Sequence, residues 1–66
     1  MTTYTDKHTG KVYALGQGYY SRTVTQYPAG TKVWFDGSAT AKPIGHETFA
    51  TQAQRTAWVR MMGFTI

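Results

Sequence analysis

Few side chains in this sequence are of the types that perform acid–base chemistry or bind metals. The 66 residues include two histidines, three carboxylates and no cysteine. His46 and Glu47 are neighbours, so in an extended segment their side chains point in opposite directions. General acid–base catalysis needs groups that converge within hydrogen-bond reach, and neither histidine has a partner at a suitable spacing. We therefore expect a protein that is not an enzyme and that has no cofactor and no metal site.

The composition indicates a small basic domain. Seven Lys and Arg against three acids give a net charge of +4, and the isoelectric point is about 9.7. The positive residues are scattered, without a run of about five like charges. No stretch approaches the roughly 20 apolar residues of a membrane span, and the opening MTTYTDKHTGK lacks a signal-peptide core. We expect a cytoplasmic protein with no membrane partner.

Turn signals divide the first half of the chain into short segments rich in Thr, Tyr and Val, which favour strands. The turns lie at 6–11, 16–18 and 27–30. The pattern predicts an antiparallel meander of about four strands, near residues 2–6, 11–15, 19–27 and 31–36. An irregular segment over 37–50 and a helix over about 51–62 complete a single α+β domain of residues 1–66. We expect this C-terminal helix to pack on one face of the sheet.

The turn Pro28-Ala29-Gly30 sets the register of the last predicted hairpin. Proline presets the first turn angle and glycine accepts the left-handed one, as in a three-residue hairpin loop. The resulting pairs are Tyr27 with Thr31, Val24 with Trp34 and Arg22 with Asp36. A four-residue loop over 7–10 pairs Tyr4 with Tyr13, and a three-residue loop over 16–18 pairs Leu15 with Tyr19.

This register sorts the side chains between two faces, because alternate residues of a strand point to opposite sides. The predicted core face holds Tyr4, Tyr13, Leu15, Tyr19, Val33 and Phe35. The other face holds Val12, Ala14, Tyr20, Arg22, Val24, Lys32, Trp34 and Asp36. We expect the helix to cover the first face and to leave the second open.

The segment TQAQRTAWVRMMG has the signals of a helix with defined ends. Thr51 and Gln54 fit a capping box, and Gly63 fits the left-handed residue that terminates a helix, with Phe64 packing back over the last turn. At 100° per residue, the broad face expected to contact the sheet holds Ala53, Ala57, Trp58, Met61 and Met62.

The open face contains more apolar residues than the usual solvent face of an antiparallel sheet. Trp, Tyr and Arg are also the residue types most enriched in interface hot spots. We therefore predict a small binding module that docks a protein partner, either a host factor or a second copy of the chain. The predicted contacts are Tyr20, Arg22, Val24, Lys32 and Trp34. A phage or mobile-element accessory protein is the expected setting, and the alternative is that residues 37–50 cover this face.

The alternative function is nucleic-acid binding through the same face and basic helix residues, with bases stacked on the aromatic rings. Its contacts would be Arg22, Lys32, Arg55 and Arg60. The order of strands followed by the helix in TFATQAQRTAWVRMMGF resembles the DNA-binding domains of some plant transcription factors and the arm-binding domains of some integrases. This resemblance is one of element order and implies no residue roles. The predicted face carries only about +1, whereas nucleic acid requires several phosphate contacts, so protein binding ranks first.

Overall fold

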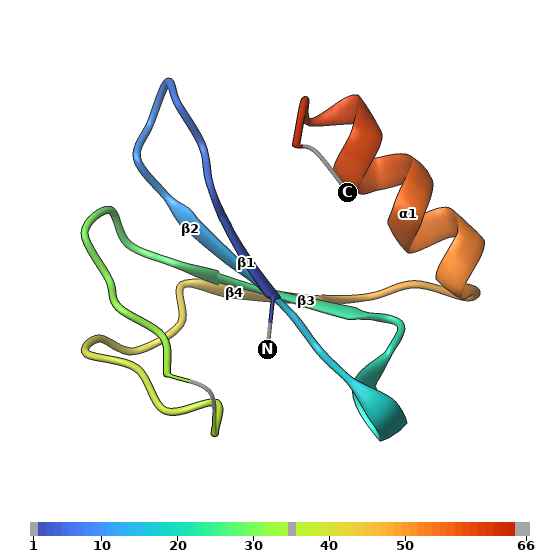
Figure 1. Cartoon of the computed structure of the whole chain (residues 1–66), viewed down its shortest axis with the longest axis horizontal. Helices are drawn as coiled ribbons and strands as arrows, with labels where there is room; N and C mark the ends of the chain where they lie inside the picture. Colours follow the sequence, from blue (N-terminus) through green and yellow to red (C-terminus); the bar gives the residue numbers. More distant parts are fainter. Residues whose placement is uncertain (1, 35, 65–66) are drawn as a thin grey trace.

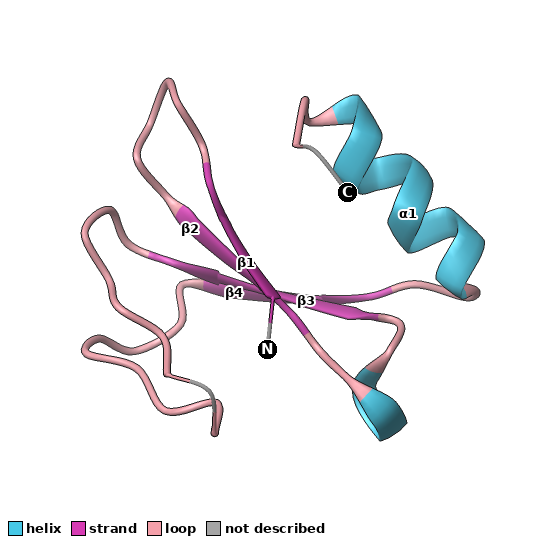
Figure 2. Cartoon of the chain, in the orientation of Figure 1, coloured by secondary structure: helices cyan, strands magenta, loops and turns pink. Residues whose placement is uncertain are grey.

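An antiparallel sheet followed by one C-terminal helix forms this domain, in a computed structural model that describes residues 2–34 and 36–64 (Figures 1 and 2). The strands are β1 (Thr2–Thr5), β2 (Val12–Leu15), β3 (Thr23–Tyr27) and β4 (Gly45–Thr48), in the spatial order β1-β2-β3-β4. A 3-10 helix, η1 (Gly18–Tyr20), joins β2 to β3, and α1 (Gln52–Met61) follows β4. The predicted α+β meander is confirmed.

The register between the first two strands is as predicted, with Tyr4 opposite Tyr13. The next connection is longer than the predicted three-residue turn, because residues 18–20 coil into η1. Leu15 consequently pairs with Val24 and not with Tyr19. Gly16 permits the chain to pass close to Tyr20 and Thr23 in this connection. A Cβ at Gly16 would collide with the main-chain oxygen of Tyr20 and the side-chain oxygen of Thr23.

The predicted fourth strand over 31–36 is wrong, since β4 consists of residues 45–48. The turn at residues 28–30 does form, and the Thr31 amide donates to Pro28 O over 3.2 Å. The chain then folds on itself: Trp34 N donates to Ser38 O at 2.7 Å and Thr40 N donates to Lys32 O at 3.0 Å. These main-chain groups find partners locally, so the edge of β3 is left for β4. We call residues 31–34 and 36–40 the side hairpin.

Both ends of α1 match the sequence prediction closely. The Thr51 hydroxyl accepts from Gln54 N at 3.1 Å, although the Gln54 side chain returns to Ala50 N and not to the cap residue itself. At the other end, Gly63 has a φ of +83°, and the amides of Gly63 and Phe64 donate to Arg60 O and Val59 O. This is the Schellman arrangement, in which a glycine in the left-handed region ends the helix.

The face that α1 presents to the sheet differs from the predicted one. Val59, which lies outside the predicted contact face, is 1% exposed, whereas Met61, which belongs to that face, is 76% exposed. Arg55 is half-buried because its Nη1 donates to Gly16 O at 2.7 Å and to Thr23 O at 3.2 Å. We call this pair of hydrogen bonds the clamp. Together with Arg55, the side chains of Trp58, Val59 and Met62 lie toward the sheet, a spacing of i, i+3, i+4 and i+7.

Apolar side chains pack on both faces of the sheet. On the helix face, the buried residues are Tyr13, Leu15, Val24 and Val59, with Phe64 stacked at 5.1 Å on Tyr4. On the opposite face, which we call the second face, Val12, Ala14 and Tyr27 are buried beneath Val33 and Ala39 of the side hairpin. Figure 1 shows α1 on one side of the sheet and the side hairpin on the other. The alternative of a covered second face is therefore correct for part of that face, although the covering segment begins before residue 37. Phe35, predicted for the core, lies outside the described residues.

Candidate functional site

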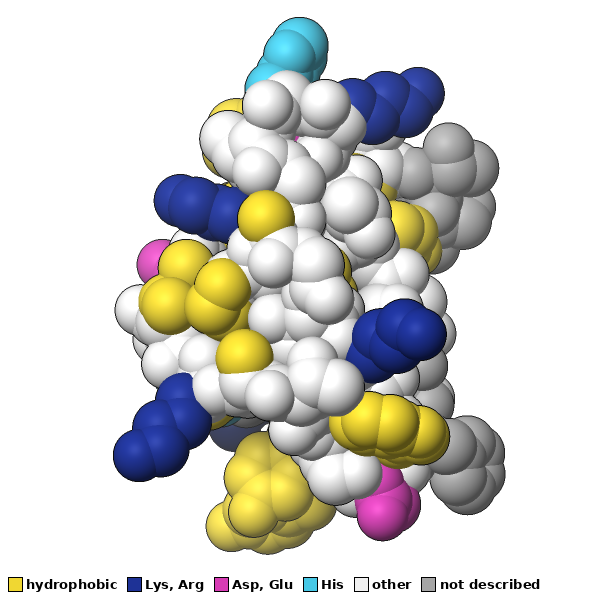
Figure 3. All heavy atoms as spheres, turned by 90° about the vertical axis from the view of Figure 1, so that its left-hand side faces the viewer, with side chains coloured by type: hydrophobic (Ala, Val, Ile, Leu, Met, Phe, Trp, Pro, Cys, Tyr) yellow, Lys and Arg dark blue, Asp and Glu magenta, His cyan; other side chains and the backbone are white. Residues whose placement is uncertain are grey.

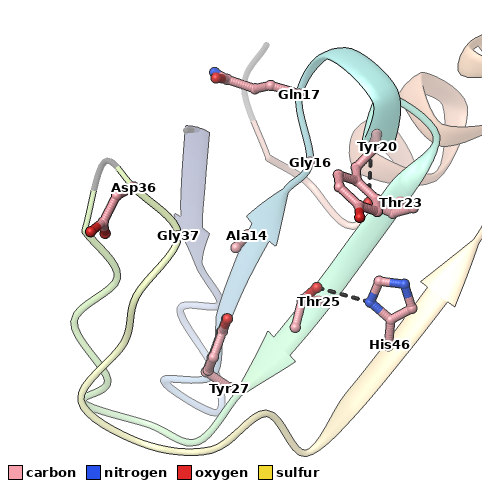
Figure 4. Close-up of a pocket in the computed structure, with 10 residues that line it drawn as sticks. All are labelled: Ala14, Gly16, Gln17, Tyr20, Thr23, Thr25, Tyr27, Asp36, Gly37 and His46. Atoms are coloured by element: carbon pink, nitrogen blue, oxygen red, sulfur yellow. Dashed lines mark hydrogen bonds between the residues drawn. The ribbon is translucent and has the colours of Figure 1, made fainter.

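A hollow of about 300 Å³ remains on the second face where the side hairpin does not cover it. We call it the sheet groove. Its floor is formed by β2 and β3, and its walls are formed by η1, β4 and the tip of the side hairpin (Figure 4). Its lining residues are Ala14, Gly16, Gln17, Tyr20, Thr23, Thr25, Tyr27, Asp36, Gly37 and His46.

Hydrogen bonds hold the polar lining of the sheet groove in place. The Thr23 hydroxyl donates to the main-chain oxygen of Tyr20 at 2.8 Å, which ties η1 to the start of β3. The Thr25 hydroxyl lies 3.0 Å from His46 Nδ1 on the neighbouring strand, as Figure 4 shows. Because Nδ1 is engaged there, the other ring nitrogen of His46 is the one left for a ligand.

A second hollow, of about 330 Å³, adjoins the first and shares Tyr20, Thr23 and His46 with it. We call it the edge groove, because it lies against β4 at the edge of the sheet. Its remaining lining residues are Tyr19, Arg22 and Thr48. Tyr19 is 94% exposed and Tyr20 is 60% exposed, and their rings meet edge to face at 5.3 Å. Two accessible aromatic rings therefore stand at this groove.

The two charged residues of these grooves do not pair as predicted. Opposite Arg22 lies Phe49, whose amide donates to Arg22 O at 2.7 Å. The Arg22 side chain donates from Nη1 to Ala50 O at 2.9 Å. Asp36 instead accepts from the hydroxyl and the amide of Ser38, at 2.7 and 3.0 Å. These hydrogen bonds lower the pKa of Asp36 below its ordinary value, so the carboxyl is ionised at neutral pH.

The five predicted partner contacts do not form one surface. Val24 is 1% exposed in the core beneath α1, so it offers nothing to a partner. Lys32 and Trp34 flank Val33, which packs toward the sheet, so both lie on the outer side of the side hairpin. Trp34 is 52% exposed there. Only Tyr20 and Arg22 line the grooves.

The predicted nucleic-acid contacts are also dispersed. Arg55 is held by two main-chain oxygens at the junction of sheet and helix, while Arg60 is exposed near the end of α1. On the side of the molecule that Figure 3 shows, the Lys and Arg side chains stand apart from one another and form no single patch. A phosphate backbone meets no continuous positive surface on that side.

Sequence reasoning placed Tyr19 in the core, which is wrong, since Tyr19 is exposed at the edge groove. It also missed Thr25, Tyr27 and His46 as groove residues. The alternation of Thr23, Val24 and Thr25 carried a usable signal, since an apolar residue between two threonines favours Val24 as the buried one. The turn-based register outweighed that signal and reversed the faces of β3. For His46 there was no signal, because its place depends on which segment pairs with β3.

The described residues contain no group of three or more His, Asp or Glu side chains placed to hold a metal ion. Among the same residues, no helix combines the length and apolar character that crossing a bilayer requires. Comparison with protein-family models, with curated proteins and with solved structures finds no match for this chain. The two grooves are therefore the features of the molecule from which a function can be inferred.

Proposed function

We propose that this chain is a small, non-enzymatic protein-binding module whose partner docks on the second face of the sheet. The observation that carries the proposal is the pair of adjoining grooves beside η1, with the exposed rings of Tyr19 and Tyr20 at their edge. Tyrosine supplies a large contact area with few rotatable bonds, and it is enriched among interface hot spots. A cytoplasmic setting is part of the proposal and is consistent with a sequence that lacks cysteine.

Local charge favours protein over nucleic acid as the partner. Among the residues that line the two grooves, Arg22 is the one Lys or Arg, and Asp36 is an ionised carboxylate. Nucleic-acid affinity is built from several phosphate contacts, each of which releases counterions. Arg55 does not add to them, because its guanidinium group is used between α1 and the sheet.

Affinity capture from the source cells, with and without nuclease treatment, tests this proposal. The wild-type chain is compared with Tyr20→Ala, and Met61→Ala on α1 serves as the control for an exposed apolar side chain. The bond from Thr23 goes to the main-chain oxygen of Tyr20, so alanine preserves it. Circular dichroism confirms that each variant is folded.

We expect one protein to be captured by the wild type and by Met61→Ala, to survive nuclease treatment and to be lost with Tyr20→Ala. Loss of the captured protein on nuclease treatment, or equal capture by Tyr20→Ala, would refute the proposal. Sedimentation of the purified chain shows whether the partner is a second copy, in which case Tyr20→Ala converts a dimer to a monomer.

A further inference from the structure

The strand β4 lies at the edge of the sheet, and no strand in residues 2–34 and 36–64 pairs with its outer side. The Phe49 amide bonds inward to Arg22 O, and the pairing continues through Glu47 opposite Val24. In an antiparallel ladder, alternate residues direct their main-chain groups to opposite sides. The N–H and C=O groups of His46 and Thr48 therefore point outward, and such a row is a template for another strand.

The side chains beside this edge carry positive charge without an acid. His46 and Thr48 line the edge groove together with Arg22, and no carboxylate belongs to the lining among the described residues. Glu47, which lies between them in sequence, has its side chain on the helix face, since adjacent strand residues point to opposite sides. The groove thus combines a guanidinium group with several hydroxyl groups.

Arg22 retains donors for a ligand. Its recorded hydrogen bond is from Nη1 to Ala50 O, and a guanidinium group has five N–H donors on three nitrogens. The bond to Ala50 fixes the side chain at the groove, which lowers the entropy lost on binding. Carboxylates are the natural acceptors for such a group, because the planar donors match the two oxygens.

From this edge and this groove we infer that the partner supplies an extended acidic segment, which adds a fifth strand beside β4. A carboxylate of that segment lies in the edge groove and accepts hydrogen bonds from Arg22. Neighbouring strands are about 4.8 Å apart, so the added strand lies about 10 Å from β3, within the combined reach of a Glu and an Arg side chain. This inference rests on the proposed function and names the chemistry of the partner.

The other edge of the sheet does not offer the same combination. The hollow beside the end of β1 is lined by Asp6 as well as Lys7, so a carboxylate there meets a like charge. The His8 amide bonded to Asp6 lowers the pKa of Asp6, so that group is ionised at neutral pH. Charge complementarity with an acidic strand therefore selects the β4 edge.

A nuclear magnetic resonance titration of the isotope-labelled full chain tests the inference. The probe is an eight-residue peptide, acetylated and amidated, in which Thr and Val alternate around one central Glu. One control peptide carries Gln in place of that Glu, and two others carry N-methyl groups on the amides along one edge or along the other. Main-chain pairing gives such complexes their affinity, and side-chain pockets give them specificity.

We expect the Glu peptide to shift the His46 and Thr48 amide signals and to slow their hydrogen exchange. The Gln peptide should bind about tenfold more weakly, which is the usual size of a charge-assisted hydrogen bond. One of the two N-methylated edges should abolish binding. Arg22→Gln should remove the difference between the Glu and Gln peptides, and Arg22→Lys should keep part of it. Arg60→Gln, which removes an exposed cation from α1, should leave the difference unchanged.

Equal binding of the Glu and Gln peptides, shifts confined to β1, or no binding by any peptide would overturn the inference. Binding of a short single-stranded oligonucleotide at Arg22, in place of the peptide, would also overturn it. These results are separable from a failure of the proposed function. If Tyr20→Ala loses the captured protein while the peptides do not bind, the proposed docking face is supported and the inferred acidic strand is refuted. If Tyr20→Ala captures the protein as well as the wild type does, the proposed function itself is refuted.

Discussion

The clamp formed by Arg55 gives the sharpest test of how helix and sheet are joined. Its Nη1 donates to Gly16 O at 2.7 Å and to Thr23 O at 3.2 Å, 39 and 32 residues away in sequence. Arg55→Met keeps much of the aliphatic bulk and removes both bonds. Hydrogen bonds from charged donors contribute about 1.5–3 kcal/mol, and the longer second bond adds less, so we expect a loss of about 2–3 kcal/mol.

That loss is large for a domain of this size, whose single core rarely supplies more than about 3–5 kcal/mol. Urea unfolding followed by circular dichroism measures it. With a slope of about 1 kcal/mol per molar urea for a small domain, the midpoint falls by about 2–3 M. Arg60→Met is the matched control: Arg60 is exposed on the same helix, so its replacement should change stability by less than about 0.5 kcal/mol. Equal urea midpoints for the two variants would show that the hydrogen bonds of Arg55 do not stabilise the fold. Arg55 would then count as a surface cation that is available to a ligand.

Three further predictions concern packing, helix termination and pH. Val59→Ala should destabilise the fold by about 2 kcal/mol in urea unfolding, because two buried methyl groups are lost. Met61→Ala should have almost no effect, because Met61 is exposed, and similar losses of stability in the two variants would contradict the helix orientation. Gly63→Ala should cost about 1–2 kcal/mol, because a side chain must then adopt a φ of +83°, and an unchanged midpoint would argue against the Schellman end. The pKa of Asp36, followed by carbon nuclear magnetic resonance, should lie below the ordinary 3.8 and should rise in Ser38→Ala. Since the folded-state pKa is the lower one, the carboxylate stabilises the fold above the unfolded-state pKa, and this contribution disappears as pH falls through the folded-state value. An Asp36 pKa that is the same in both proteins would contradict the bond to Ser38.

Sequence signals that act over a few residues predicted the local structure correctly. The Thr51 cap, the Gly63 end and the turn at residues 28–30 all form, because each is completed by groups within about five residues of chain. The pairing of Tyr4 with Tyr13 also follows from a short loop. The α+β meander with a terminal helix is the sum of such signals.

The errors of the sequence prediction arose where the partner of a strand depends on segments that are distant in the sequence. The sequence prediction paired residues 31–36 with β3, whereas β4 takes that place and the side hairpin forms its bonds internally. The longer connection through η1 pairs Leu15 with Val24, which reversed the faces of β3 and placed Val24 in the core. The pairing of β4 with β3 separately brought His46 beside Thr25. An odd-numbered change of register exchanges every side chain between faces, so the error in the β2–β3 connection propagated to the predicted site.

The amino-acid sequence alone thus determined the α+β meander with its terminal helix, both ends of that helix and the turn at residues 28–30. Long-range contacts determined the rest. Arg55 joins α1 to the sheet through Gly16 and Thr23, and the pairing of β4 with β3 places His46 at the two grooves. The physical reason is that caps and turns are satisfied by nearby main-chain groups, whereas the partner of a strand edge depends on the whole chain.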